Sequence, residues 1–533
     1  MASFDQHIWL ADNGDGTYRN PILHADYSDP DAIRTGADYF LVASSFNSVP
    51  GVPVLHSYDL VNWKIINHVI GRIPFPEYSK PQHGRGVWAP SIRFHNSKYY
   101  VYIPLPDEGI FMSTAVHPAA EWSPPVCVRD GQGWIDPCPF WDDDGRAYLV
   151  NAFAYSRIGV KSMLHLSPMH PDGSVLLGEG KCIFDGTATH PTIEGPKLYK
   201  RNGWYYIFAP AGGVPAGWQA VLRSRNIWGP YEDKIVLHQG STAVNGPHQG
   251  ALVDTQNGEW WFLHFQDAGA FGRISHLQPV WWEDDWPVIG INQDSQGRGE
   301  PVMKYKKPDV GRIWPVYSPV VNDDFSGNSL GLQWQWEANP EQDWYTCLPS
   351  EKKLRLHAQA ISPDMPFCIR NHPAVLCQKF PARLFTVETC VALHADIPGA
   401  AAGLAVLGNA YAYIVIEKQD KDYRIRFCTK SVSVDTAGSV AAQEERHLCA
   451  EEVWVDGPRV NSGTIWFRLN VDYHAQCRFS WSADGNMFRM LGDTFSASPG
   501  RWVGAKIGLF AIKNLRTEIS SYADFGYFTV REL

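Results

Sequence analysis

The chain has 533 residues, of which 44% are hydrophobic and 13% aromatic, and its formal net charge is −10. This length exceeds one ordinary hydrophobic core and predicts two or three domains. The negative charge, without any basic cluster, disfavours nucleic acid and anionic membranes as partners. The 22 Trp favour carbohydrate, because sugar rings have apolar faces that pack on indole, although aromatic sheet cores account for part of them.

The N-terminal residues contain neither a basic region nor an apolar stretch of signal length, and no later segment approaches the ~18 apolar residues of a membrane span. We therefore expect a cytoplasmic protein, or a secreted one if a signal was removed. The ten Cys are scattered, without a CxxC pair, and predict free thiols. Asp12-Asn13-Gly14-Asp15-Gly16 begins like a calcium loop, but glycines occupy two ligand positions, so a turn is predicted.

One pattern occurs five times in the first ~290 residues. Each copy has a short opening that leads into an apolar run. The openings are Ser28-Asp29-Pro30-Asp31, Trp88-Ala89-Pro90-Ser91, Asp136-Pro137-Cys138-Pro139, Glu194-Gly195-Pro196-Lys197 and His248-Gln249-Gly250-Ala251. The copies are about 50 to 60 residues apart, which is the period of a propeller blade. Residues 1–318 are therefore predicted to form a five-bladed β-propeller with the openings facing its axis.

Turn signals such as Asn96-Ser97 and Arg201-Asn202-Gly203 separate strand-like runs and predict hairpins within the blades. The pattern ends in a Pro-, Lys- and Gly-rich linker at about residues 299–319. Alternating runs such as Ile465–Val471 follow to the C-terminus and predict a β-sandwich over residues 319–533. The fold class is therefore all-β, a propeller followed by a sandwich.

Three of the five openings carry a carboxylate, namely Asp29, Asp136 and Glu194. Inner strands of a propeller converge on one channel, so these three side chains should share a pocket. Like charges and burial raise carboxyl pKa values, which lets one group act as an acid while another stays ionised as a base. Cleavage of a glycosidic bond needs that pair. The alternative for each residue alone is a turn-capping role.

These motifs, taken together, resemble glycoside hydrolase family 43, in its β-xylosidase and α-L-arabinofuranosidase branch. The resemblance covers nearly the whole chain and rests on the phrases Asn20-Pro21-Ile22-Leu23, Asp29-Pro30, His56-Ser57-Tyr58-Asp59, Gly86-Val87-Trp88-Ala89-Pro90, Asp136-Pro137, Glu194-Gly195-Pro196 and Tyr522-Ala523-Asp524-Phe525. It implies a propeller of inverting enzymes with a concanavalin-like sandwich that helps to close the pocket. Asp29 then matches the general base, Glu194 the general acid and Asp136 the carboxylate that positions the acid. No cofactor is implied as required.

Five further residues match positions of the family, but the sequence around them is less specific than it is around the three carboxylates. Trp88 resembles an aromatic wall of the sugar subsite and Phe46 lies on the loop beside it; core and solvent-side packing are the alternatives. Arg273 resembles an arginine that reaches sugar hydroxyls, or forms a surface ion pair. Phe510 resembles a residue on a sandwich loop that leans over the pocket, with core packing the alternative. His248 resembles a channel histidine that holds a structural Ca²⁺ or its waters in some members, or is a hydrogen-bonded structural histidine.

The sequence therefore predicts an exo-acting, inverting glycoside hydrolase that releases β-D-xylose or α-L-arabinofuranose from oligosaccharides of xylan or arabinan. A sugar-binding propeller without catalysis and an endo-arabinanase are the alternatives. The preferred pentose and the oligomeric state, including a homo-oligomer, stay open.

Overall fold

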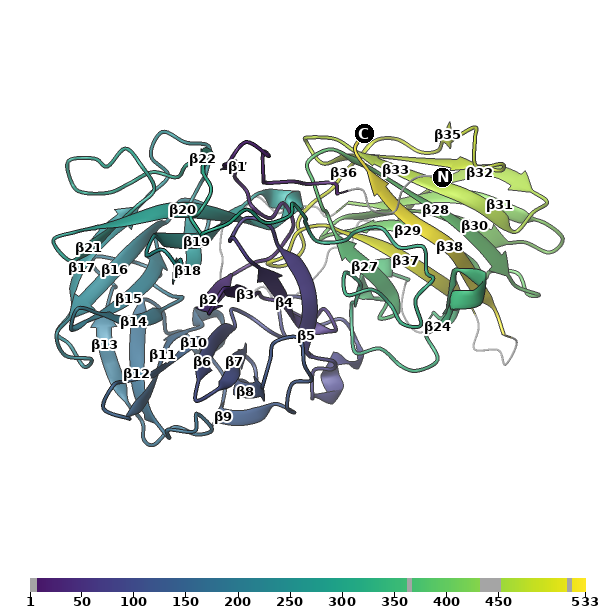
Figure 1. Ribbon diagram of the computed structural model, residues 1–533. Helices are drawn as coiled ribbons and strands as arrows, with labels where there is room; N and C mark the ends of the chain where they lie inside the picture. The colour runs from purple at the N-terminus through teal and green to yellow at the C-terminus, as the bar shows by residue number, and fades with distance from the viewer. Residues whose placement is uncertain (1–6, 362–366, 432–451, 515–519) are drawn as a thin grey trace.

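The protein folds into two β-domains that lie side by side. The computed structural model describes residues 7–361, 367–431, 452–514 and 520–533, and Figure 1 shows the propeller in purple to teal and the sandwich in green to yellow. The prediction of an all-β propeller followed by a β-sandwich is confirmed. The predicted boundary at residue 318 falls between the last strand of the propeller side and the first strand of the sandwich.

The propeller consists of five antiparallel sheets of four strands, each formed by consecutive strands. The blades are β2 (Asp31–Thr35), β3 (Asp38–Val42), β4 (Gly51–Ser57) and β5 (Lys64–Ile70); β6 (Ser91–His95), β7 (Lys98–Leu105), β8 (Gly109–Ala115) and β9 (Val126–Asp130); β10 (Trp134–Trp141), β11 (Ala147–Phe153), β12 (Met163–Met169) and β13 (Lys181–Asp185); β14 (Lys197–Arg201), β15 (Trp204–Ala211), β16 (Trp218–Ser224) and β17 (Glu232–Leu237); and β18 (His248–Asp254), β19 (Trp260–Asp267), β20 (Arg273–Glu283) and β21 (Trp286–Ile289).

The innermost strands form a closed ring. Strand β2 contacts both β6 and β18, so the first and fifth blades meet, and β10 contacts both β6 and β14. Outside the ring, β1 (Thr17–Arg19) pairs with β22 (Lys304–Lys306), which ties the N-terminal segment to the chain that leaves the fifth blade. The five openings therefore surround one axis.

Local sequence accounts for the hairpins inside the blades. Asn96 and Ser97 both have positive φ between β6 and β7, and Asn202 and Gly203 do the same between β14 and β15. Two-residue turns of this kind match the twist of the strands that they connect, and Asn and Gly adopt positive φ at low cost. These predicted turns are confirmed.

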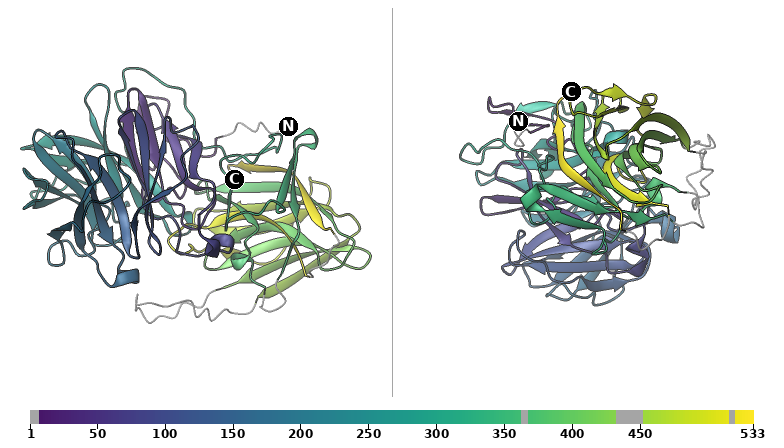
Figure 2. Two further views of the ribbon diagram at one scale, coloured as in Figure 1. Left: turned by 90° about the horizontal axis from the view of Figure 1, so that it is seen from below. Right: turned by 90° about the vertical axis from the view of Figure 1, so that its right-hand side faces the viewer.

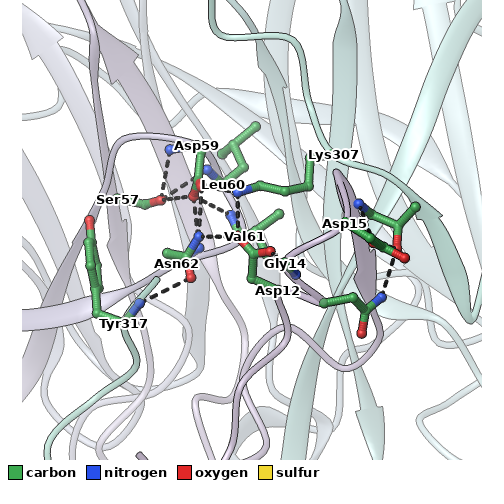
Figure 3. Close-up of polar contacts among 12 residues, drawn as sticks. Asp12, Gly14, Asp15, Ser57, Asp59, Leu60, Val61, Asn62, Lys307 and Tyr317 are labelled. Carbon is green, nitrogen blue, oxygen red and sulfur yellow. Dashed lines mark hydrogen bonds and ion pairs between the residues drawn. The ribbon is translucent and has the colours of Figure 1, made fainter. Parts of the chain in front are cut away.

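The connection to the sandwich is fastened to the first blade, as Figure 3 shows. Lys307 forms ion pairs with Asp12 and with Asp59, the latter at 2.8 Å, and the Tyr317 amide donates to the Asn62 side chain at 3.2 Å. Asp12 also accepts a hydrogen bond from the Gly14 amide at 2.9 Å, which closes the predicted turn. The linker therefore packs on the propeller along part of its length.

The sandwich consists of two eight-stranded sheets. One contains β23 (Gln335–Trp336), β26 (Gln359–Ala360), β27 (Val375–Lys379), β37 (Lys506–Lys513), β29 (Ala401–Leu407), β30 (Tyr411–Lys418), β31 (Tyr423–Lys430) and β32 (Val453–Val460); the other contains β24 (Tyr345–Leu348), β25 (Lys353–His357), β38 (Tyr522–Arg531), β28 (Phe385–His394), β33 (Thr464–Val471), β34 (Gln476–Ser482), β35 (Arg489–Met490) and β36 (Phe495–Ser496).

The core between these sheets follows from strand alternation. In β33 every second residue, from Ile465 to Val471, is buried and the residues between them are half-buried. Side chains of a strand point alternately to its two faces, so one face of β33 lies in the core. The alternating pattern seen in the sequence is therefore the pattern of a sheet with one buried face.

Helices are short throughout the described ranges. They are η1 (Pro76–Ser79), α1 (Tyr155–Ile158), η2 (Gly269–Phe271), η3 (Pro349–Glu351) and η4 (Ile369–Asn371). Among the residues that the structure describes, no helix has the length and apolar character needed to cross a membrane.

The sandwich docks on the first blade of the propeller, as the left view of Figure 2 shows. Its strand β23 exchanges two backbone hydrogen bonds with the propeller, because Val49 donates to Trp336 at 3.0 Å and Trp336 donates to Val49 at 2.6 Å. The Asn47 side chain donates to the Glu337 carbonyl at 2.7 Å. Lys506 donates to Ser48 at 2.8 Å and forms an ion pair with Glu337 at 2.6 Å. The loop between β3 and β4 is therefore held by the second domain.

Candidate active site

Three carboxylates stand at the openings of inner strands. Asp29 precedes β2, Asp136 lies in β10 and Glu194 precedes β14. Asp29 and Asp136 have positive φ values of 55° and 54°. Non-glycine residues adopt this conformation at a cost of ~1 kcal/mol or more, and such strain concentrates at functional sites. The repeated opening therefore places each of these two carboxylates in the same unusual backbone geometry.

Asp29 is buried and held on both of its oxygens. Ser28 and Ser44 donate hydroxyl hydrogen bonds to its Oδ2 at 2.6 and 2.5 Å. Arg273 Nη1 lies 3.5 Å from Oδ1 and donates to the Ser28 hydroxyl at 3.2 Å. The donors fix the direction of a carboxylate that can accept a proton from water.

Asp136 positions the backbone next to Glu194. Its Oδ2 accepts a hydrogen bond from the Gly195 amide at 2.7 Å and one from Gln249 Nε2 at 3.3 Å. A Cβ at Gly195 would lie 2.8 Å from the Gln249 side chain, and φ is +59°, so this position needs glycine. Burial raises the pKa of Asp136 to about 6, with a smaller rise from Asp29, while Lys197 and the two N–H donors act in the lowering direction.

Glu194 has the properties of an acid. Burial, together with the charges of Asp136 and Asp29, raises the pKa of Glu194 to about 8, against the lowering influence of Arg273. Its side chain is still 32% exposed, so a substrate can reach it. His248 Nε2 lies 3.4 Å from Glu194 Oε1, and burial, with Arg273, lowers the pKa of His248 to about 3. At neutral pH Glu194 therefore keeps its proton beside a neutral imidazole.

Trp88, at the opening of the second blade, and Phe46, on the loop between β3 and β4, lie next to each other. Phe46 and Val87 exchange backbone hydrogen bonds at 2.8 and 3.0 Å, and the rings of Phe46 and Trp88 are 6.4 Å apart. The Trp88 indole donates to the Gly84 carbonyl at 3.2 Å, and the guanidinium of Arg157 lies 5.0 Å from the centre of its ring. Both predicted residues therefore lie together, with Trp88 half-buried.

Residues 18–287 match the model of glycosyl hydrolases family 43, and residues 322–531 match the beta-xylosidase C-terminal concanavalin A-like domain. The chain belongs to glycoside hydrolase family 43. Inverting glycoside hydrolases use two carboxyl groups, one as general acid and one as general base.

Relatives match over most of their length. A "Putative beta-xylosidase" of Xylanibacter ruminicola is 40% identical over 93% of this chain and 86% of its own. A non-reducing end alpha-L-arabinofuranosidase of Bacteroides ovatus is 30% identical over 80% of this chain and 82% of its own. The crystal structure of a GH43 protein from Bacillus licheniformis is 25% identical, with a TM-score of 0.80, and covers 97% of this chain and 100% of that one.

The substrate-binding role predicted for Phe510 on a loop over the pocket does not hold, and its alternative, buried packing, is what the structure shows. Phe510 lies in β37, not in a loop, and is fully buried with its ring 5.6 Å from that of Tyr413. Its neighbour Leu509 packs in the core between the two sheets, so strand alternation turns Phe510 to the opposite face. Phe510 therefore packs in a second apolar cluster, on the face of its sheet that points away from the core between the sheets.

Trp502 is the sandwich residue that lies near the site, and the sequence reasoning missed it. The Arg273 guanidinium is 5.7 Å from the centre of the Trp502 ring. A Cβ on Gly84 would lie 3.5 Å from Trp502 Cδ1, so Trp502 also lies beside the residue that anchors Trp88. The glycines on both sides of it, at 500 and 504, mark a loop and are the signal that could have identified it.

Asp26 connects the two domains behind Arg273. Its Oδ1 accepts a hydrogen bond from the Arg273 amide, and its Oδ2 accepts one from the Gly504 amide, both at 2.9 Å. A Cβ on Gly504 would lie 2.7 Å from Gly272, so the two chains are in tight contact here. One buried carboxylate therefore sets the position of the Trp502 loop relative to Arg273.

The residues around His248 do not fit a directly bound metal ion. Ca²⁺ takes six to eight oxygen ligands. Among the residues that the structure describes, no group of three or more His, Cys, Asp or Glu side chains is arranged to hold a metal. The His248 ring packs 5.4 Å from Phe265 and faces Glu194.

Proposed function

We propose that this family 43 glycoside hydrolase is an exo-acting, inverting enzyme that removes a terminal β-D-xylose or α-L-arabinofuranose from oligosaccharides. The proposal rests on two carboxyl groups in different environments: burial and nearby carboxylates raise the pKa of Glu194, whereas hydroxyl and guanidinium donors hold the two oxygens of Asp29. The names of the relatives from Xylanibacter ruminicola and Bacteroides ovatus support these two sugars.

In the proposed reaction, Glu194 donates its proton to the glycosidic oxygen as the bond to the anomeric carbon breaks. Asp29 accepts a proton from the water that attacks this carbon from the opposite face, so the released sugar has the inverted configuration. Asp136 takes part by holding the Gly195 amide, which fixes the backbone that carries Glu194. Inversion predicts a separation of roughly 6.5 to 9.5 Å between the Asp29 and Glu194 carboxyls.

An exo mode of action is supported by the position of the sandwich. Trp502 and the Asn47–Pro50 loop bring residues of the second domain to one side of the carboxylates. A pocket closed on that side accepts a chain end, whereas an endo-acting enzyme needs an open groove.

The test is hydrolysis of p-nitrophenyl β-D-xyloside and α-L-arabinofuranoside, with the first anomer followed by NMR. We expect release of at least one pentose, with the anomeric configuration opposite to that of the substrate. Retention of configuration, or no release of either sugar, contradicts the proposal.

A further inference from the structure

A pocket lies where the propeller, the linker and the sandwich meet. It encloses about 610 Å³, including the part that opens to solvent. The propeller contributes His24 and His68 to its lining, the linker region contributes residues 318–321, and the sandwich contributes Gln378 and Lys379. None of the residues assigned above to the candidate active site lines this pocket. The interdomain pocket is therefore a separate site.

Three polar side chains of the interdomain pocket have a buried nitrogen without a hydrogen-bond partner. Within the described residues, these atoms are Nδ1 of His24, Nδ1 of His68 and Nε2 of Gln378, and the Gln378 side chain as a whole is 4% exposed. Arg383 Nε donates to His24 Nε2 at 3.3 Å, so the ring proton of neutral His24 lies on Nδ1. A buried donor without an acceptor destabilises the fold, so these groups call for an acceptor that the chain does not supply.

Lys379 brings a positive charge to the same pocket. Its Nζ lies 5.6 Å from the centre of the Tyr27 ring, which also lines the pocket. In the part of the chain that the structure describes, Lys379 forms neither a hydrogen bond nor an ion pair. Lys506, directly opposite on β37, is by contrast paired with Glu337 at 2.6 Å. The charge of Asp26 also acts on Lys379, but the oxygens of Asp26 accept hydrogen bonds from two backbone amides. The Lys379 ammonium therefore lacks a partner of its own.

The rest of the lining is uncharged and mostly apolar. Although the chain has a formal net charge of −10, no Asp or Glu is found among the described residues that line the pocket. Burial, with the charge of Arg383 on His24 and of Lys379 on His68, lowers the pKa of both imidazoles to about 3, so both are neutral at pH 7. An apolar wall with a few polar groups is typical of a small-molecule site. The wall includes Trp9, Ile22, Leu23, Ile65 and Leu332.

We propose that the interdomain pocket binds a small organic carboxylate, which pairs with Lys379, accepts hydrogen bonds from His24 and Gln378, and packs its apolar body against the wall. A single ammonium among neutral groups matches the single charge of a carboxylate. Because the walls come from both domains and the linker, a bound carboxylate stabilises their docking. This inference does not rest on the proposed hydrolase function, since binding is measured without hydrolysis.

The first experiment is isothermal titration of the full chain with butyrate and with butyramide, a neutral probe of the same shape, at constant ionic strength. We expect saturable binding of butyrate and at least about tenfold weaker binding of butyramide. Lys379→Met keeps the length of the side chain and removes its charge, so it should weaken butyrate binding about ten- to a hundredfold. The matched control is Lys352→Met, an exposed lysine of the sandwich outside the pocket, which should leave the Kd unchanged.

A second variant and a second readout cover a Lys379→Met protein that fails to fold. Gln378→Met removes the amide at nearly constant length and should weaken butyrate binding about three- to tenfold. For the wild type, butyrate should raise the melting temperature progressively with concentration, because a ligand that binds only the folded state stabilises it. Butyramide and inorganic phosphate should raise it less.

The results that would overturn the proposal are distinct. Absence of butyrate binding would mean that the pocket holds only water. Equal affinity for butyramide would remove the role of the charge, and equal affinity for phosphate would remove the role of the apolar wall. Butyrate binding that is unchanged in both Lys379→Met and Gln378→Met would place the ligand elsewhere on the protein.

Discussion

Replacement of Glu194 by Gln tests the division of labour between the carboxylates. The amide has the same shape and keeps a polar group near His248, but it has no proton to donate to a leaving oxygen. Because Glu194 is protonated at neutral pH, the substitution changes no charge there, and the fold should keep its stability. The variant therefore isolates proton donation.

The magnitude follows from the pKa of Glu194. With a value of about 8, about nine-tenths of the molecules carry the proton at pH 7 and about one-tenth at pH 9, so wild-type kcat/KM should fall about tenfold between these values. General acid catalysis contributes roughly 10²- to 10⁴-fold. We expect Glu194→Gln to lose that factor on an oligosaccharide, whose leaving group needs protonation.

The assay compares two substrates. On p-nitrophenyl glycosides the leaving group departs as a stable phenolate, so Glu194→Gln should lose much less activity there and should also lose the basic limb of the pH profile. Thermal unfolding at pH 7 is the control for folding. Equal losses on both substrates, or a basic limb that persists in the variant, would refute the assignment of Glu194 as the acid.

Three other substitutions test the contacts between the domains. Trp502→Ala should lower kcat/KM about tenfold, because the Trp502 ring covers Arg273, and thermal unfolding should show little loss of stability. Unchanged kinetics would place Trp502 outside the site. Asp26→Asn should lower the free energy of unfolding, measured by urea denaturation, by about 1–3 kcal/mol, because one of the two backbone amides that donate to Asp26 loses its acceptor. It should also lower kcat/KM. A variant with unchanged stability would contradict this prediction. Lys506→Met should destabilise the protein by about 3–5 kcal/mol, since it leaves the Glu337 carboxylate buried and unpaired. Adding Glu337→Gln should recover most of the lost stability. A double variant that is no more stable than Lys506→Met would show that the ion pair itself is required.

The sequence by itself determined the fold and the three carboxylates. The blades repeat at a fixed spacing, and every blade uses the same local signals, so the position of one opening predicts the others. Asp29, Asp136 and Glu194 follow from that register, because the ring brings equivalent positions of its inner strands to one axis. Their assignment needed no knowledge of the loops.

The tertiary structure alone decided which residues of the second domain come near them. Phe510 and Trp502 are both aromatic residues near glycines in the sequence, but one lies in a strand and turns to the outer face, while the other lies in a loop beside Arg273. The bridging role of Asp26 was equally hidden. Such features depend on how two domains dock and on the direction of single side chains, and neither is set by a periodic pattern in the chain.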